Sequence, residues 1–173
     1  MLWILLGVAL VISAVTDLLQ RQIFDLVTLP TLGLALTARG FKDGFGDLER
    51  GVLSGLVSAA GASFLFALLA WKGRMGWGDV KLMAAVGGAF GYPTVMAAMI
   101  FVSLAGALQA IVTLMWQGEA LSAARTIGDR WLKALRRKPL ADVAKLRTIP
   151  YGVAIALGSF WAMWWESTSG IAN

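Results

Sequence analysis

Residues 51–91 read GVLSGLVSAAGASFLFALLAWKGRMGWGDVKLMAAVGGAFG, and this segment decides what kind of protein the chain is. Residues 51–71 contain no charged side chain, and a run of that length is long enough to cross a bilayer as a helix. A second apolar run begins at Leu82, and the acid Asp79 and the cation Lys81 lie between the two runs. Charge at or near a bilayer is costly and is usually there for a reason. Asp79 therefore needs an explanation.

The composition of the whole chain agrees with a membrane protein. Of its 173 residues, 58% are hydrophobic and only 14% are charged, whereas a soluble domain carries about 25% charged residues. The chain has no cysteine and no histidine. Disulfides, thiolate nucleophiles, Cys/His zinc sites and Ser-His triads are therefore excluded. Any chemistry must use carboxylates, hydroxyls, Lys, Arg or the backbone.

The apolar runs predict an all-α, polytopic membrane protein with about six transmembrane helices in a single domain, residues 1–173. The runs fall at residues 2–20, 24–38, 51–71, 80–92, 94–116 and 149–165. The first run lacks the positive start and the cleavage site of a signal peptide, so we expect it to be retained. The run 80–92 gives a helix of roughly 20 Å, shorter than the bilayer core of about 30 Å, and predicts a recessed, hydrated pocket.

The cations predict the orientation in the membrane. The segment 117–148 contains eight Lys and Arg residues. If this segment is cytoplasmic, the alternation of spans puts residues 17–23 and 72–81 on the same side, which then holds 12 of the 15 cations. The opposite side keeps only Arg39, Lys42 and Arg50. We therefore expect a cytoplasmic basic loop at about 117–148 and both termini on the other side.

The basic segment 125–147 has two interpretations. Ile127, Trp131 and Leu135 recur every four residues among cations, as in an amphipathic helix lying on anionic lipid. The alternative is an ordinary positive-inside loop. The segment does not predict a nucleic-acid partner, so the lipid bilayer is the expected partner of this surface.

The predicted orientation puts two acids on the same side of the membrane. Asp17 lies about one turn before the end of the first run, and Asp79 lies at the start of the fourth. If their helices pack together, the two carboxyls can share one proton, because two like charges that close cannot both ionise. One carboxylate would take a proton from water while the other donates to a carbonyl oxygen. This chemistry hydrolyses an amide and requires neither a metal nor a cofactor.

Structural interpretations of the same charged residues stay open. Asp79 directly precedes a helical run and is a favoured residue type for a helix N-cap, a role that does not exclude catalysis. Asp17 and Arg21 are four residues apart and could form an interfacial ion pair. Lys81 could be a cation whose long side chain reaches the membrane surface.

Other classes of function also remain open from the residues alone. Gly76 and Gly78 could give a loop its flexibility, or could let the backbone lie close to a substrate strand. A small proton-coupled transporter could use Asp17 and Asp79 as relay acids, although no inverted repeat is visible. A purely structural scaffold would leave the acid pair unexplained.

Three motifs together resemble the type IV prepilin peptidases, which are GxGD-type aspartic membrane proteases. Residues 74–91, RMGWGDVKLMAAVGGAFG, are similar to the second catalytic motif of that family. Residues 17–30, DLLQRQIFDLVTLP, are similar to the first, with Asp17 and Asp25 eight residues apart and Pro30 in place. Residues 149–163, IPYGVAIALGSFWAM, are similar to a segment of the family's last helix. One departure is Phe24, where the family often has proline.

The resemblance implies a catalytic pair, Asp17 and Asp79, with Gly76 and Gly78 as the glycine frame of the second motif. It implies an aspartic endopeptidase of the bacterial inner membrane that removes the basic leader of a prepilin or Flp-like pilin precursor at the cytoplasmic face. The candidate substrate-binding residues are Gly76, Gly78, Asp25, Arg21 and Lys81. Bifunctional members carry an N-terminal extension with paired cysteines and N-methyltransferase activity. This sequence has no cysteine and begins directly with its first predicted span, so we expect it to resemble the short, peptidase-only members. The motifs do not predict the oligomeric state.

Overall fold

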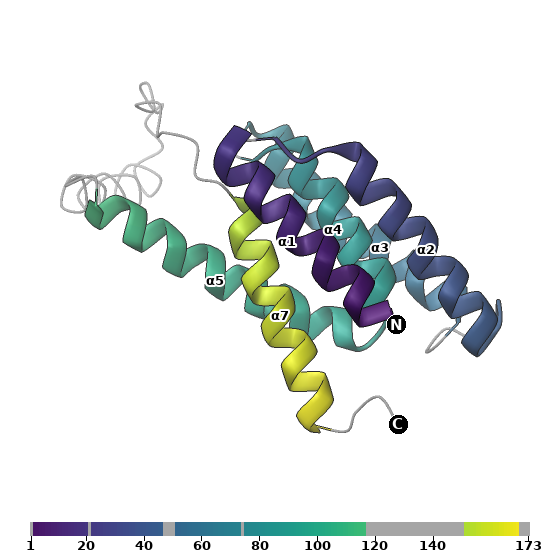
Figure 1. Cartoon of the computed structure of the whole chain (residues 1–173). Helices are drawn as coiled ribbons and strands as arrows, with labels where there is room; N and C mark the ends of the chain where they lie inside the picture. The colour runs from purple at the N-terminus through teal and green to yellow at the C-terminus, as the bar shows by residue number, and fades with distance from the viewer. Residues whose placement is uncertain (1, 21, 47–50, 74, 117–150, 170–173) are drawn as a thin grey trace, which may run out of the picture. The chain divides into compact units, whose positions relative to one another are not determined.

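A computed structural model describes residues 2–20, 22–46, 51–73, 75–116 and 151–169, and all its secondary structure is helical. The predicted all-α fold is therefore confirmed for this part of the chain, which contains six helices (Figure 1). They are α1 (Leu2–Gln20), α2 (Asp25–Asp43), α3 (Val52–Trp71), α4 (Trp77–Phe90), α5 (Thr94–Trp116) and α7 (Tyr151–Ser169).

Three of these helices are long and apolar enough to cross a membrane: α1, α3 and α5. The other three predicted spans correspond to α2, α4 and α7. Of these, α4 has 14 residues, which is about 21 Å of helix at about 1.5 Å per residue. The protein is therefore a helical membrane protein, and the full count of six spans stays a prediction.

Three of the predicted boundaries are wrong, because hydropathy locates apolar residues and not the ends of helices. α2 continues beyond residue 38, past two cations, and ends at Asp43. Its C-cap is Gly44, whose φ of 80° is unfavourable for other residues. α4 begins at Trp77, three residues before the apolar run, and α7 extends to Ser169 instead of ending at 165.

Residue contacts divide the chain into two compact units. The first comprises Met1–Gly106 with Pro150–Asn173, and the second comprises Ala107–Ile149. The described part of the second unit is the end of α5, and the expected amphipathic segment 125–147 lies outside the described residues. The single domain 1–173 stays a prediction. All the features described below belong to the first unit.

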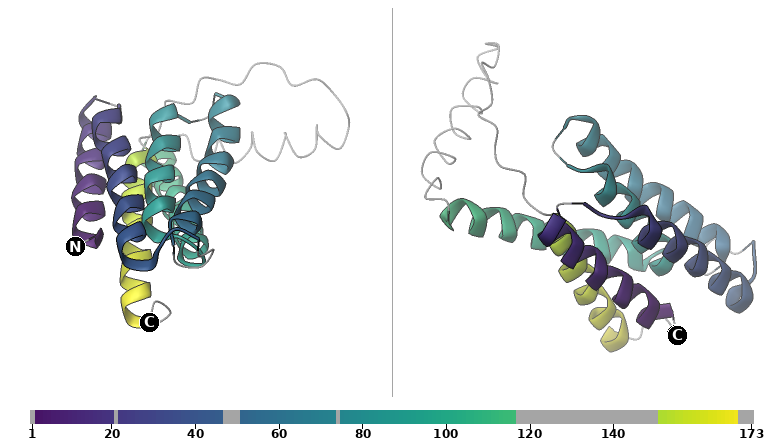
Figure 2. Two further views of the ribbon diagram at one scale, coloured as in Figure 1. Left: turned by 90° about the vertical axis from the view of Figure 1, so that its right-hand side faces the viewer. Right: turned by 45° about the horizontal axis from the view of Figure 1, so that its top comes forward.

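α4 is the central helix of the first unit. It contacts α1, α2, α3 and α7, and α2, α3 and α4 run alongside one another in two views (Figures 1 and 2). Ten of its 14 residues are buried. This burial explains how so short a helix is accommodated, because its neighbours cover it on several faces. The largest fully buried apolar side chains are Leu6, Leu10, Leu82, Met83, Val86 and Ile155.

Glycines allow α4 to pack closely against α3. A Cβ atom placed on Gly87 would lie 2.6 Å from the carbonyl oxygen of Ser58, a distance that real Cβ atoms do not adopt. A Cβ atom on Gly55 of α3 would lie 2.8 Å from Leu36 and 3.1 Å from the carbonyl oxygen of Gly88. Small residues at such contacts let the backbones of membrane helices approach each other. This close contact with α3 helps to set the position of α4, and so of the acid at its start.

Candidate active site

Asp17 lies in the last turn of α1, next to the first turn of α7. The two helices pack side by side (Figures 1 and 2). The backbone N–H of Gly152 donates a hydrogen bond to Asp17 Oδ2 at 2.7 Å. Asp17 is only 7% exposed, so this bond is shielded from water. A donor from one helix therefore orients an acid on another.

Asp79 lies at the third position of α4, and its predicted place as the N-cap is wrong. The N-cap is Gly76, whose φ and ψ of −75° and 147° are extended. Asp79 Oδ2 accepts a hydrogen bond from the N–H of Gly76 at 3.2 Å. This is the half of a capping box in which a side chain at the third helical position returns to the N-cap backbone. Asp79 thus stabilises the start of α4 from the third position of the helix and not from the N-cap.

The fold brings Asp17 and Asp79 close enough to interact electrostatically. Asp79 is 7% exposed and precedes the apolar run 80–92. Burial raises the pKa of Asp79 to about 7, the negative charge of Asp17 acts in the same direction, and the hydrogen bond from Gly76 opposes them. Asp79 Oδ1 is buried and has no hydrogen-bond partner among the described residues. The two helices pack together as predicted, and the sharing of one proton between the two carboxyls stays a prediction.

Asp25, at the start of α2, and Lys81, near the start of α4, form an ion pair. Lys81 Nζ lies 2.7 Å from Asp25 Oδ1 and 2.6 Å from Asp25 Oδ2. The two side chains are 54% and 42% exposed for Asp25 and Lys81 respectively. The ion pair therefore joins the first turn of α2 to the second turn of α4 at the surface. Arg21 lies outside the described residues, so its ion pair with Asp17 stays a prediction.

The two glycines of the second motif do not adopt a conformation that requires glycine. Among the described glycines, positive φ values occur at Gly44, Gly73 and Gly91. A Cβ atom on Gly78 would instead lie 2.8 Å from the Cβ atom of Ile23, in the linker between α1 and α2. The close backbone approach at Gly78 is therefore made by the protein's own chain. Flexibility does not explain this glycine.

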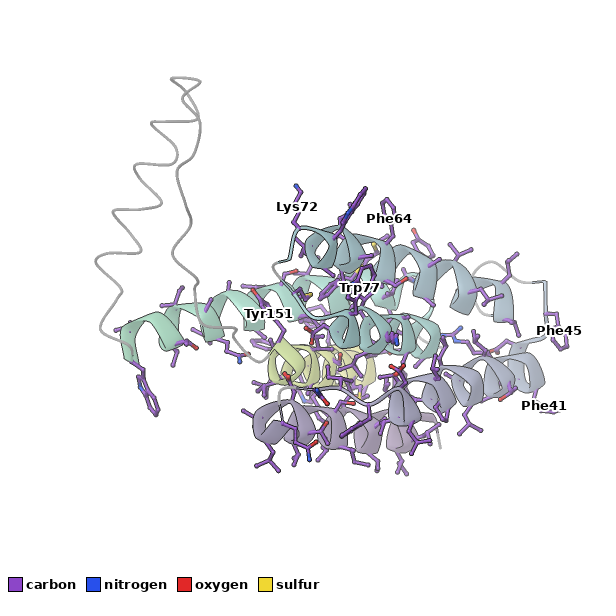
Figure 3. All side chains as sticks on the ribbon, turned by 90° about the horizontal axis from the view of Figure 1, so that it is seen from above. Phe41, Phe45, Phe64, Lys72, Trp77 and Tyr151 are labelled. Atoms are coloured by element: carbon purple, nitrogen blue, oxygen red, sulfur yellow. The ribbon has the colours of Figure 1, made fainter. Side chains whose placement is uncertain are left out.

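Gly152 is the residue of this site that the sequence analysis did not single out. Its signal was present, because Gly152 lies within the quoted segment 149–163. No motif or spacing connects it with Asp17, which lies near the other end of the chain. Figure 3 labels the neighbouring Tyr151 at the start of α7 and Trp77 at the start of α4. Both lie away from Phe41, in the last turn of α2, and from Phe45, just after that helix.

The fold and the site define a helical membrane protein with two buried, interacting carboxyls where three helices meet. Within the described part of the chain, no group of three or more acidic, His or Cys side chains could hold a metal ion. The chain belongs to the type IV leader peptidase family, whose model matches residues 4–111. The matched region contains both Asp17 and Asp79 but ends before α7.

The chain is similar to bacterial proteins named prepilin leader peptidase/N-methyltransferase. It is 32% identical to that of Aeromonas hydrophila over 111 residues, which are 63% of this chain and 37% of the relative. It is 31% identical to that of Pseudomonas aeruginosa over 114 residues, which are 65% of this chain and 38% of the relative. The matches thus span little more than a third of these relatives. No solved structure matches the chain at a comparable level of significance.

Proposed function

We propose that the protein is an aspartic endopeptidase that cleaves the basic leader from prepilin-like proteins, with Asp17 and Asp79 as its catalytic pair. The observation that carries this proposal is the pair itself: two buried carboxyls, from helices far apart in sequence, whose charges interact. The family and the names of the relatives support a peptidase. They do not favour the alternative of a proton-coupled transporter.

In the proposed reaction the two acids have different roles. The raised pKa of Asp79 leaves a large fraction of its carboxyl groups protonated near neutral pH, which suits a general acid. Asp17, as the carboxylate, accepts a proton from a water molecule whose oxygen attacks the scissile carbonyl carbon. Asp79 donates its proton to the carbonyl oxygen. When the tetrahedral intermediate collapses, the C–N bond breaks, Asp17 passes its proton to the leaving amine, and Asp79 takes back a proton from a hydroxyl of the intermediate as the new carboxyl forms.

The charge distribution of the chain supports a cytoplasmic location for this reaction. The side that carries the acids also carries 12 of the 15 cations under the predicted orientation. A prepilin-like substrate would present its basic leader there, ahead of a hydrophobic helix in the bilayer. The proposed enzyme is thus a multi-pass protein of the bacterial inner membrane that acts at its cytoplasmic face.

The ion pair of Asp25 and Lys81 suggests how the proposed surface would bind a basic leader. A basic side chain of the leader would compete with Lys81 for Asp25, because both carboxylate oxygens of Asp25 already bind Lys81. An exposed pair of this kind contributes only about 0.2–1 kcal/mol, so exchange of its partner is inexpensive. Arg21 is proposed to belong to the same surface, beside the glycine frame of Gly76 and Gly78.

The test is cleavage of a prepilin substrate by purified protein in lipid or detergent. Asp17→Asn and Asp79→Asn keep the size of the side chain and an oxygen that can accept the hydrogen bonds of Gly152 and Gly76. Neither amide can transfer the catalytic proton. We expect cleavage to fall by several orders of magnitude in each variant, with the amount of protein in the membrane unchanged. The double variant should be little worse than either single one, because groups that act as a unit are not additive.

Asp25→Asn is the matched control. It removes an acid at the same end of the helices and breaks the ion pair with Lys81, yet it leaves both proposed catalytic groups in place. We expect cleavage to decrease only mildly. An Asp79→Asn protein that processes prepilin at a near-normal rate would end the peptidase interpretation.

A further inference from the structure

The two buried acids are held by donors of different origin. Asp79 accepts its hydrogen bond from Gly76, three residues away, so the start of α4 orients it locally. Asp17 accepts its hydrogen bond from Gly152 of α7, which lies 135 residues later in the sequence. The orientation of Asp17 Oδ2 therefore depends on α7, which lies outside the region matched by the family model.

The contact at Gly152 leaves no room for a side chain. A Cβ atom on this residue would lie 2.7 Å from Asp17 Oδ2 and 2.9 Å from Asp17 Cβ. Gly152 has no positive φ, so its backbone conformation would accept any residue. The feature that requires glycine here is the contact with Asp17.

We propose that Gly152 is a positioning residue for Asp17: its N–H holds Oδ2, and its missing side chain allows the carboxyl to lie against α7. The inference rests on the proposed function and adds to it a third element of the site, contributed by the last helix. Gly152 acts through Asp17 and does not itself touch the reacting atoms. It fixes the carboxyl in the orientation from which Asp17 accepts the proton of the attacking water.

The test is Gly152→Ala, assayed for kcat and KM with a prepilin substrate. The added methyl group must displace the carboxyl of Asp17, and a displacement of about 1 Å in a catalytic group can cost about 100-fold in rate. We expect kcat to fall by about that factor while KM changes little. A role in packing alone would instead lower the amount of folded protein and leave kcat per folded molecule unchanged.

Two glycine variants serve as controls. A Cβ atom on Gly158, also on α7, would clash with the backbone of Val102 on α5, well away from Asp17. Gly158→Ala should lower the unfolding midpoint and the amount of protein but leave kcat per folded molecule unchanged. A Cβ atom on Gly33 of α2 meets nothing within 4 Å, so Gly33→Ala should behave as wild type.

The outcomes separate this inference from the function on which it rests. If the wild type cleaves and Asp17→Asn does not, a Gly152→Ala protein with normal kcat overturns the inference alone. So does a Gly152→Ala protein that is lost from the membrane or behaves like Gly158→Ala, because Gly152 would then serve packing only. A wild type that cleaves no prepilin overturns the proposed function, and the inference with it.

Discussion

Asp17 and Asp79 are chemically identical side chains in two different settings. Asp79 lies in the first turn of a buried helix, where burial and the charge of Asp17 raise its pKa to about 7. Asp17 lies in the last turn of its helix and is oriented by a backbone N–H from α7. Two titratable groups whose surroundings differ in this way are suited to different steps of one proton transfer.

The activity should therefore depend on pH with a bell-shaped profile. Below a pH of about 7, Asp79 keeps the proton that the proposed reaction donates, so activity should fall as the pH rises above about 7. At lower pH the pair becomes fully protonated, and activity should fall again because no carboxylate is left to accept a proton. The two apparent pKa values belong to the coupled pair. Measurement of kcat between pH 4 and 9 checks this.

A chelator provides the companion measurement for the same mechanism. Because the two carboxyls supply both proton transfers, EDTA should leave the rate unchanged at every pH. Activity that is lost in the chelator and restored by a divalent cation would replace the proposed mechanism with metal-assisted hydrolysis.

At the scale of the element, side chains form hydrogen bonds with backbone groups at both ends of α4. Asp79 accepts the N–H of Gly76 at its start. The last carbonyls of a helix lack partners within the helix. At the end of α4, Arg39 of α2 donates Nη2–H bonds to the carbonyl oxygens of Ala89, at 3.1 Å, and of Phe90. Gly91 follows with φ 65° and donates its N–H to the carbonyl of Gly87 at 2.9 Å. The short central helix is thereby anchored to α2.

Arg39→Met should destabilise the folded protein. The substitution leaves the carbonyls of Ala89 and Phe90 in a half-buried place without their donor, and an unsatisfied group of this kind costs about 1–3 kcal/mol. Lys42→Met is the matched control, since it removes an exposed cation from the same helix and the same side of the predicted topology. Its effect should stay within about 0.5 kcal/mol. Equilibrium unfolding in detergent measures both, and equal effects would contradict the anchoring role of Arg39.

At the scale of the whole molecule, the placement of charge decides which side of the membrane carries the acids. Asp79 lies at the start of α4, Asp17 lies at the end of α1 beside the start of α7, and Arg39 lies at the other end of α4. Under the predicted orientation, the acid end is cytoplasmic and the Arg39 end faces away from the cytoplasm. The cation bias argues for this orientation independently of the family.

Labelling of single cysteines tests the orientation directly, because the chain has no cysteine of its own. A cysteine introduced at Ser122 or Ala141 should react with a membrane-impermeant maleimide only from the cytoplasmic side. A cysteine at Asp43, in the last turn of α2, should react only from the opposite side. The reverse pattern would place both acids away from the cytoplasm and would exclude cleavage at the cytoplasmic face.

The sequence by itself determined the helical membrane class, the approximate helices and the two acids, because each of these is a local property. Apolar runs of bilayer length have few alternatives to helix, and a buried acid in such a chain stands out by composition alone. Only the tertiary structure decided which groups meet: Gly152 with Asp17, Ile23 with Gly78, and Arg39 with the end of α4. These contacts join segments far apart in sequence through backbone atoms or the absence of a side chain. No periodicity or spacing in the sequence encodes such contacts.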